Sequence, residues 1–505
     1  MFTTEEKYQF LIDILDSVPS DSVKAFLMDN IFELTTVQES ILAQLLKGYW
    51  ETGRPELPSK YRAKILHAFR LGKTLLEVMR NMVAMRTDWC RDLMYGKEIL
   101  LIYVPNEKYF SVAEPVYTGV RAKLGLRSIL IYESSRNLHC FSKYDHLNLS
   151  KFPVAWAEFG DSCGKIIKLR NEVRKNPDYR DFLSSVFSAT WFHEFRILLR
   201  QVRLKHLFKN CDGNIIGVFN CMPTSGFGND LNIVASRFGK PTFSFRKDTT
   251  YHDVENFFIH TDFLFAKGKY ELDIYKRAGL EKKSRIYIVG SPQGMNSRPF
   301  PRRGDGNKIR IMFVDQHIGE LFPQESKGRF SAVLGNVLRL FPRFELAIKL
   351  HPSTTDCTVY AAAFSKAGFT NYVVYPICTD IYTAISESDY VLMFSSTVGF
   401  DAILMRKPLL VLSDAFLGIE FKNFFFDERV AHTIKDEREL YQLIKNIEEG
   451  SFNRKDERDI AGFLEEHMTY TGAESLTKIV DLLEEKISAK QKGRDAKIRD
   501  LIATR

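Results

Sequence analysis

Three hydroxyl residues, Ser395, Ser396 and Thr397, stand between two apolar runs in the segment YVLMFSSTVGFDAILMRKPLLVL. The pattern predicts a strand, a polar turn, a helix and a second strand, so the hydroxyls fall where the helix begins. Unpaired backbone N–H groups and the helix dipole stabilise a phosphate or carboxylate there. The hydroxyls would add donors, and Gly399 would let the backbone approach a ligand closely. The alternative is that Ser396 or Thr397 only caps the helix.

Two more polar loops follow predicted strands in the same part of the chain. AIKLHPS leads into His351, which Pro352 holds in an extended conformation before Ser353, and IMFVD is followed by Gln316 and the flexible Gly319. Because parallel strands end at one edge of a sheet, we expect the three loops on one rim, where they would form an anion site. His351 would donate to a phosphate and stabilise the charge of a leaving nucleotide; the alternative is a structural histidine.

The scaffold for these loops is predicted from the alternation of apolar runs with helical segments. One such series begins at residue 98 and a second at residue 309, and GSPQGMNSRPFPRRGDGN lies between them as a hinge linker. Two open α/β domains leave a cleft between the carboxyl ends of their sheets. The predicted segments are a helical region 1–95, a first domain 96–290, a linker 291–308, a second domain 309–485 and a basic tail 486–505.

Composition limits the class of protein. With 45% hydrophobic and 27% charged residues, the chain is predicted to be a soluble globular protein. No apolar run is long enough to span a bilayer, and MFTTEEKYQFLIDILDSV is unlike a secretory signal, so we expect a cytoplasmic location. The net charge of +8 favours an anionic partner only weakly. The basic tail either contacts the inner face of the membrane peripherally or is a solvated terminus.

Several reaction classes lose their usual sequence support. The seven cysteines are scattered without a Cys-x-x-Cys pair, and no His/Cys cluster has metal-ligand spacing, so no metal site is predicted. The absence of Gly-x-Gly-x-x-Gly, Walker and His-Glu-x-x-His sequences removes the usual support for a dehydrogenase, an NTPase or a metallohydrolase.

The run KLHPS, followed by DYVLMFSSTVGFDAILMRKPLLVL, resembles the C-terminal domain of GT-B glycosyltransferases. It is most similar to the group that uses cytidine-activated donors: bacterial polysialyltransferases, capsule Kdo transferases and CDP-glycerol glycerophosphotransferases. In these families the His-Pro pair and the Ser/Thr motif bind the nucleotide phosphate. The resemblance implies this role for His351, Pro352, Ser395, Ser396 and Thr397.

The resemblance covers roughly residues 210–415, including the strand entry GKPT and the run RIYIVGSP at the end of the first domain. Two features depart from it. FRKDTTYHD stands where many relatives carry Gln-His-Gly, and the acidic motif of the sialyltransferases is not evident. The chemistry on the acceptor side and the identity of the sugar are therefore not carried over.

The resemblance implies a GT-B fold, with two Rossmann-like parallel-sheet domains facing a cleft. It implies a bacterial, metal-independent glycosyltransferase of capsule polysaccharide biosynthesis that needs no cofactor and binds no nucleic acid. The nucleotide-sugar donor, a CMP-sugar or a CDP-linked group, would bind the second domain, and a glycan or lipid-linked acceptor the first. The alternatives are an enzyme like UDP-N-acetylglucosamine 2-epimerase and a non-catalytic nucleotide-sugar-binding protein on the same fold.

Inverting transfer would need a general base within hydrogen-bond reach of the acceptor hydroxyl. The candidates on loops of the first domain are Asp248, Glu107 and either His252 or Asp253, each of which could also be an ordinary polar loop residue. We favour Asp248 because it follows a predicted strand at the rim. Arg246 and Lys247 beside it would attract an acidic acceptor or the donor phosphate.

Two further positions have equally open interpretations. FNCMPTSGFGND, with Gly226 and Gly228 before a helix, is either a second anion or acceptor loop or a plain turn that Asn229 or Asp230 caps. Asp401 either meets the ribose of the nucleotide or is an ordinary acid near a helix N-terminus.

Overall fold

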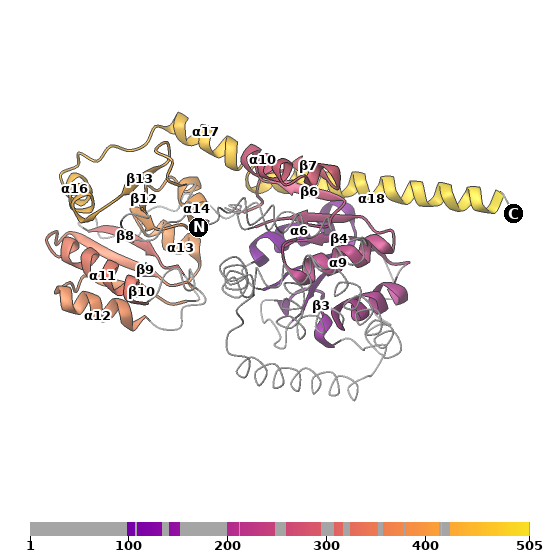
Figure 1. Cartoon of the computed structure of the whole chain (residues 1–505), viewed down its shortest axis with the longest axis horizontal. Helices are drawn as coiled ribbons and strands as arrows, with labels where there is room; N and C mark the ends of the chain where they lie inside the picture. Colours follow the sequence, from indigo (N-terminus) through magenta and orange to yellow (C-terminus); the bar gives the residue numbers. More distant parts are fainter. Residues whose placement is uncertain are drawn as a thin grey trace, which may run out of the picture. The chain divides into compact units, whose positions relative to one another are not determined.

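The computed structural model describes residues 98–106, 109–133, 141–151, 199–211, 213–247, 259–293, 308–316, 324–351, 357–377, 379–413, 416 and 425–503. The chain forms two compact units, Met1–Pro292 with Glu474–Arg505 and Gln293–Ala473 (Figure 1). The helical region predicted for residues 1–95 lies outside the described residues. No described helix is long and apolar enough to cross a membrane.

The first unit contains a parallel sheet with the strand order β3-β2-β1-β4-β5-β6-β7. Its central strands are buried on both faces, which explains why they appear in the sequence as continuous apolar runs. The strands are β1 Ile99–Tyr103, β2 Arg127–Tyr132, β3 His146–Asn148, β4 Ile215–Asn220, β5 Thr242–Phe245, β6 Phe263–Ala266 and β7 Arg285–Ile288.

Helices cover both faces of this sheet. Leu100 and Ile102 of β1 point into a core shared with α6 (Phe110–Leu124), whereas Ile99 and Leu101 point into a core shared with α9 (Gly226–Arg237) and the helix at 199–211. The helix α10 (Lys269–Arg277) follows β6, and 3-10 turns occupy Leu149–Lys151 and Leu280–Lys282.

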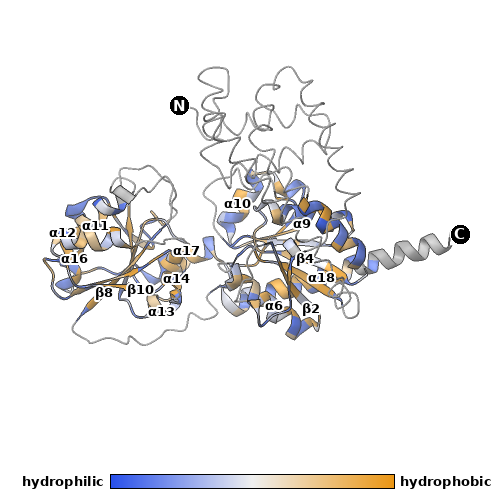
Figure 2. Ribbon diagram, turned by 90° about the horizontal axis from the view of Figure 1, so that it is seen from below, coloured by the Kyte–Doolittle hydropathy of each residue, from blue (hydrophilic) through white to orange (hydrophobic). Residues whose placement is uncertain are grey.

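The C-terminal helix α18 (Gly472–Ala503) returns to the first unit. It buries Ile479, Val480 and Leu483 in the core that contains α6, and Figure 2 shows its apolar part beside α6. A Cβ atom at Gly119 of α6 would lie only 3.2 Å from Leu476 and Val480. Residues 474–485, which we expected in the second domain, therefore pack on the first unit, because the apolar face of α18 completes its core.

The predicted basic tail continues this helix. The Lys490 Nζ atom lies 3.1 Å from Asp262 Oδ2, and the Lys486 ammonium lies 5.1 Å from the centre of the Tyr287 ring. The first turns of the tail are thus docked on the first unit beside β6 and β7, rather than being a solvated, frayed terminus.

The second unit contains a parallel sheet with the order β10-β9-β8-β11-β12-β13. The strands are β8 Ile309–Val314, β9 Phe344–Lys349, β10 Tyr372–Tyr375, β11 Tyr390–Met393, β12 Leu409–Leu412 and β13 Ala431–Ile434. The helices are α11 Gln324–Leu338, α12 Thr358–Ala367, α13 Ile381–Ser386, α14 Val398–Leu404, α16 Glu437–Glu448 and α17 Glu457–His467. Two apolar cores, one on each face, hold them on the sheet.

Both sheets reverse their strand order at one point. In the first unit the chain moves from β1 to β2 and β3 on one side and then crosses to β4, and in the second it moves from β8 to β9 and β10 before it crosses to β11. In open α/β sheets, ligands bind outside the carboxyl ends of the strands at such a switch point. The two switch points therefore lie at the ends of β1 and β4 and at the ends of β8 and β11.

Candidate functional site

The side chain of Gln316 joins two of the three predicted loops across the switch point of the second unit. Its Oε1 atom accepts a hydrogen bond of 2.7 Å from the Ser395 backbone N–H, and its Nε2 atom donates to the Ser395 carbonyl. Gln316 follows β8 and is 8% exposed, whereas Ser395 follows β11. In this structure the amide therefore holds the turn of hydroxyls, rather than presenting itself to a ligand.

Asp315 joins the third loop to the same rim. Its Oδ2 atom accepts a hydrogen bond of 3.3 Å from the His351 backbone N–H, and its Oδ1 atom accepts from Lys327 Nζ at 2.8 Å and from the Tyr360 hydroxyl. Burial and the Asp315 charge raise the pKa of Tyr360, so that its proton stays in place as a donor. The three loops thus lie together, as the strand order predicts.

Two buried lysines lie beside these loops. Lys327 pairs with Asp315, and that pair is neutral as a whole. Lys349, the last residue of β9, donates to the carbonyl oxygens of Leu350 at 3.3 Å and Ile377 at 3.1 Å. A buried ammonium beside half-exposed His351 favours an anion at this edge. The only sign of Lys349 in the sequence is a lysine at the end of the predicted strand, directly before the loop of His351.

The hydroxyl turn is only weakly engaged in capping α14. The Ser396 Oγ atom accepts a long hydrogen bond of 3.3 Å from the Val398 N–H. Thr397 occupies the N-cap position, but its side chain forms no capping hydrogen bond within the described part of the chain. Ser395, Ser396 and Thr397 are all partly exposed. The geometry leaves their hydroxyl groups at the rim, where a ligand would meet them.

Gly399 has a packing role that we did not expect. A Cβ atom at this position would lie 2.5 Å from the tip of the Phe425 ring and 2.6 Å from the terminal methyl of Met393. The glycine therefore lets α14 pack closely on the core of the second unit, and its close approach to a ligand stays a prediction.

Asp401 is tied to a neighbouring helix. Its Oδ1 atom accepts a hydrogen bond of 3.2 Å from the Tyr382 hydroxyl, which comes from α13. Both side chains are partly exposed. Tyr382, which sequence reasoning missed, thus stands beside the residue proposed to meet a ribose.

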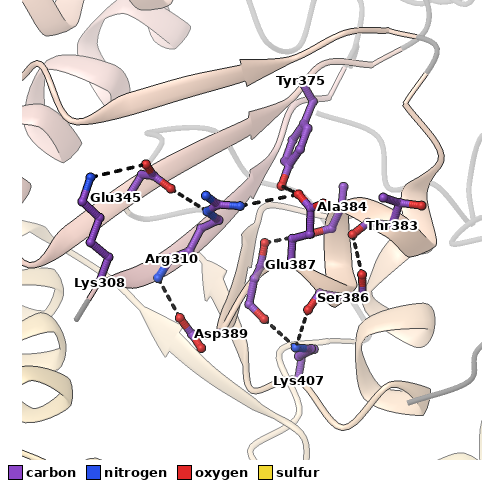
Figure 3. Close-up of polar contacts among 11 residues, drawn as sticks. Lys308, Arg310, Glu345, Tyr375, Thr383, Ala384, Ser386, Glu387, Asp389 and Lys407 are labelled. Carbon is purple, nitrogen blue, oxygen red and sulfur yellow. Dashed lines mark hydrogen bonds and ion pairs between the residues drawn. The ribbon is translucent and has the colours of Figure 1, made fainter. Parts of the chain in front are cut away.

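A cluster of charged residues holds α13 against the sheet (Figure 3). The Arg310 guanidinium contacts Glu345 at 2.5 Å and Glu387 at 3.5 Å, and the Tyr375 hydroxyl donates to Glu387 at 2.8 Å. Burial and the Glu387 carboxylate raise the pKa of Tyr375 to about 12. Lys407 Nζ donates to the carbonyls at the end of α13, those of Ser386 at 3.1 Å and Ser388 at 2.6 Å.

In the first unit, the two predicted basic residues after β5 differ in position. Arg246 is buried, and its charge acts on the buried Tyr275. The Lys247 ammonium lies 6.0 Å from the centre of the Tyr109 ring, near the ends of β1 and β4. Lys267 Nζ donates to the backbone carbonyls of both, at 2.8 and 3.0 Å. Of the two, Lys247 is therefore the one at the rim.

The turn with Gly226 and Gly228 is capped by a residue of its own loop. Ser225 caps α9, since its Oγ atom accepts from the Gly228 N–H at 2.9 Å. Neither Asn229 nor Asp230, our expected caps, has this role, and Asp230 Oδ2 instead pairs with Arg200 at 2.9 Å. A Cβ at Gly228 would lie 2.4 Å from the Met222 carbonyl, so this glycine permits a tight turn. Gly226 is buried in the first turn of α9.

Several predicted site residues lie outside the described residues and stay predictions: Glu107, Asp248, His252, Asp253, Gly319, Pro352 and Ser353. Within the described part of the chain, no group of three His, Cys, Asp or Glu side chains is arranged to hold a metal ion.

Comparison with known proteins adds one family and a set of folds. Residues 315–421 match the family model described as capsule polysaccharide biosynthesis protein. No curated protein matches the sequence. The chain is similar to a structure described as a UDP-N-acetylglucosamine 2-epimerase from Listeria monocytogenes, with 11% identity over 78% of this chain and 98% of the other and a TM-score of 0.50.

Two further structures are similar at slightly lower scores. The wall teichoic acid polymerase TagF is 12% identical over 86% of this chain and 98% of its own, with a TM-score of 0.49. MurG from Acinetobacter baumannii is 11% identical over 77% of this chain and 100% of its own, with a TM-score of 0.45.

At such identities, similarity is evidence of the fold alone. The epimerase-like structure and the two parallel sheets confirm the predicted α/β class and the GT-B type of fold. The matched family segment begins at Asp315 and includes His351 and the hydroxyl turn, the loops that meet at the switch point of the second unit.

Proposed function

We propose that the protein is a metal-independent glycosyltransferase that uses a cytidine-nucleotide donor, a CMP-sugar or a CDP-linked group, to extend a bacterial cell-surface glycan. The observation that carries the proposal is the joined rim of the second unit, where Gln316 and Asp315 hold the hydroxyl turn and His351 together beside buried lysines. The match to a capsule biosynthesis family over the same segment supports it.

The donor phosphate would lie on Ser395, Ser396 and Thr397, with His351 as a further donor. As the bond to the transferred group breaks, negative charge grows on this phosphate, and fixed donors stabilise it without rearranging. Asp401, oriented by Tyr382, would accept hydrogen bonds from the ribose.

The acceptor would bind the first unit, with Asp248 as the general base and Glu107 and His252 as the alternatives. Base and acceptor hydroxyl must come within hydrogen-bond reach, so that the proton leaves as the oxygen attacks. We place the protein in the cytoplasm, with peripheral membrane contact through residues 486–505, where a lipid-linked acceptor is accessible.

The test is calorimetric titration of the purified chain with CMP, CDP, UMP and UDP in EDTA. The variants are His351→Ala and Ser396→Ala, and the matched control is Ser365→Ala, an exposed serine on α12 of the same unit. We expect cytidine nucleotides to bind best, with at least about tenfold loss in the site variants and none in the control.

Each other outcome has a definite meaning. Preference for UDP would redirect the proposal to a UDP-sugar transferase or an epimerase-like enzyme. Absence of nucleotide binding by folded protein would contradict the site. Donor hydrolysis or glycan extension that Asp248→Asn abolishes, with nucleotide affinity intact, would separate an enzyme from a non-catalytic binding protein.

A further inference from the structure

The switch point of the first unit also combines a strand end with the start of a helix. β4 ends at Asn220, and α9 begins at Gly226 after a short turn capped by Ser225. The N-terminus of a twelve-residue helix attracts anions, since its first N–H groups lack intrahelical partners. A helix N-terminus alone does not identify a ligand site, so the evidence for one must come from the surrounding side chains.

Two buried asparagines supply donors at this helix end. Asn220 Oδ1 accepts from the Met222 N–H at 2.9 Å and Asn229 Oδ1 accepts from the His260 N–H at 3.2 Å, which fixes the orientation of both amides. Their Nδ2 atoms are buried and have no hydrogen-bond partner among the described residues. Asn220 is 0% exposed and Asn229 is 1% exposed. A buried donor left in this state is costly, and only an acceptor satisfies it.

The Asn220 amide is directed at the first turn of α9. Its Nδ2 atom lies 2.8 Å from the point where a Cβ on Gly228 would stand. Asn229 belongs to that same first turn. Asn232, one turn further, differs because its Nδ2 atom donates to Ser244 Oγ at 3.0 Å and to the His260 carbonyl at 2.6 Å, which ties α9 to its neighbours.

One positive charge near this position, that of Lys247, favours an anion. The Lys247 charge acts on Cys221, the residue after Asn220, and opposes the rise that burial causes in the pKa of that thiol. Two acids near this position share one arginine: Asp230 of α9 pairs with Arg200 at 2.9 Å and also accepts from Gln201 at 2.8 Å. Glu133, after β2, is paired with the same arginine at 3.1 Å.

We propose that Asn220, Asn229, Lys247 and the first turn of α9 form an anion-binding site in the first unit that takes a phosphate or carboxylate group of the acceptor. That the bound anion is part of the acceptor rests on the proposed function, whereas the binding of an anion does not. The site makes an anionic glycan, or one linked through a phosphate, the favoured acceptor class.

The experiment uses inorganic pyrophosphate as the probe and the full-length chain carrying His351→Ala and Ser396→Ala, which removes the cradle in the second unit. In this background, calorimetry is expected to show binding that Lys247→Gln weakens at least about tenfold. The matched control is Lys269→Gln, an exposed lysine of α10 that pairs with Asp273. Asn220→Asp replaces the inward donor by a carboxylate oxygen and is expected to abolish binding, unlike Asn210→Asp on the exposed face of the helix at 199–211.

Circular dichroism of each variant establishes that it is folded. Lack of pyrophosphate binding in the background variant, or equal binding by Lys247→Gln and Lys269→Gln, would overturn the inference. The two proposals can fail separately: pyrophosphate binding that depends on Lys247, in a protein that binds no nucleotide, would remove the proposed function and retain the anion site. Unchanged CMP or CDP affinity in Lys247→Gln is expected if both are right.

Discussion

At the scale of single residues, Gln316 has the most consequential contact of the candidate site. Its side chain hydrogen-bonds both the N–H and the carbonyl of Ser395, so one amide fixes the turn at the end of β11 relative to β8. A carboxylate of the same shape would keep the acceptor for the N–H but would face the carbonyl with a second oxygen.

We therefore expect Gln316→Glu to lower the free energy of unfolding of the second unit by about 1–3 kcal/mol and to weaken nucleotide binding. Urea denaturation and calorimetry are the measurements. Gln442→Glu is the control, because Gln442 is exposed on α16 and bonds only a neighbouring Asn446 side chain at 2.8 Å among the contacts described for it. Equal effects of the two substitutions would show that the Ser395 contacts have no special weight.

A second prediction at this scale concerns Gly399. Because an added methyl would overlap Phe425 and Met393, Gly399→Ala is expected to destabilise the second unit by about 1–3 kcal/mol and to shift the hydroxyl turn. Gly462→Ala is the matched control, since a Cβ there meets open space within α17, and it is expected to stabilise by about 0.5–1 kcal/mol. Rescue of Gly399→Ala by Phe425→Leu would identify the overlap as the cause.

At the scale of elements, the end of α14 has an unusual backbone conformation. Arg406 has a φ of 57°, in the left-handed region that glycine adopts without strain. Arg406→Gly is expected to raise the melting temperature and to stabilise the unit by about 1 kcal/mol. Arg458→Gly, at an exposed position in the first turn of α17, should instead destabilise by up to about 1 kcal/mol. A destabilised Arg406→Gly variant would contradict this account.

The contact of α17 with α14 gives the second unit a pH dependence. His467 lies 4.3 Å from the Phe463 ring and 6.1 Å from Phe400 of α14, and burial lowers its pKa to about 4. Glu466 raises this pKa, while the Arg429 charge lowers it and Asp427 raises it. The ordinary pKa of a histidine is about 6.5. The unfolded state therefore binds more protons than the folded state between about pH 4 and pH 6.5.

The contribution of His467 to the free energy of unfolding is expected to be fully present above about pH 6.5 and to be lost as the pH falls towards 4. Urea titrations at several pH values should show a shallower fall for His467→Phe, while His432 and His260, whose pKa values burial also lowers to about 4, retain their own contributions. An unchanged slope in His467→Phe would exclude this histidine as a source.

At the scale of the whole molecule, the sequence predicted two parallel α/β units because their strands are continuous apolar runs. It predicted the meeting of three loops because each follows a strand, and parallel strands end at one edge of a sheet. The sequence could not predict that α18 completes the core of the first unit, because the apolar pattern of an amphipathic helix does not identify the core against which it packs. The pairing of Asp230 with Arg200 and of Asp315 with Lys327 were missed for a similar reason, since partners separated along the chain are chosen by the fold. The packing role of Gly399 was missed because a turn near a ligand and a close helix contact select the same residue.

Truncation tests the role of α18. Removal of residues 474–505 deletes Ile479 and Leu483 and exposes the core residues of the first unit that these two side chains cover. It is expected to cause aggregation or loss of folding of the first unit. Removal of residues 493–505 leaves those contacts, and Lys490 with its Asp262 partner, in place, so thermal unfolding should change little. Equal behaviour of the two truncations would contradict the assignment of α18 to the first unit.

The return of α18 also separates the order of synthesis from the order of folding. The strands of the first unit are translated before the second unit, whereas α18, which packs in the core that contains α6, is translated after it. The whole second unit is translated in between and can fold as a continuous segment. The apolar side of α6 therefore stays uncovered while the second unit is translated. We expect nascent chains of this protein to bind ribosome-associated chaperones.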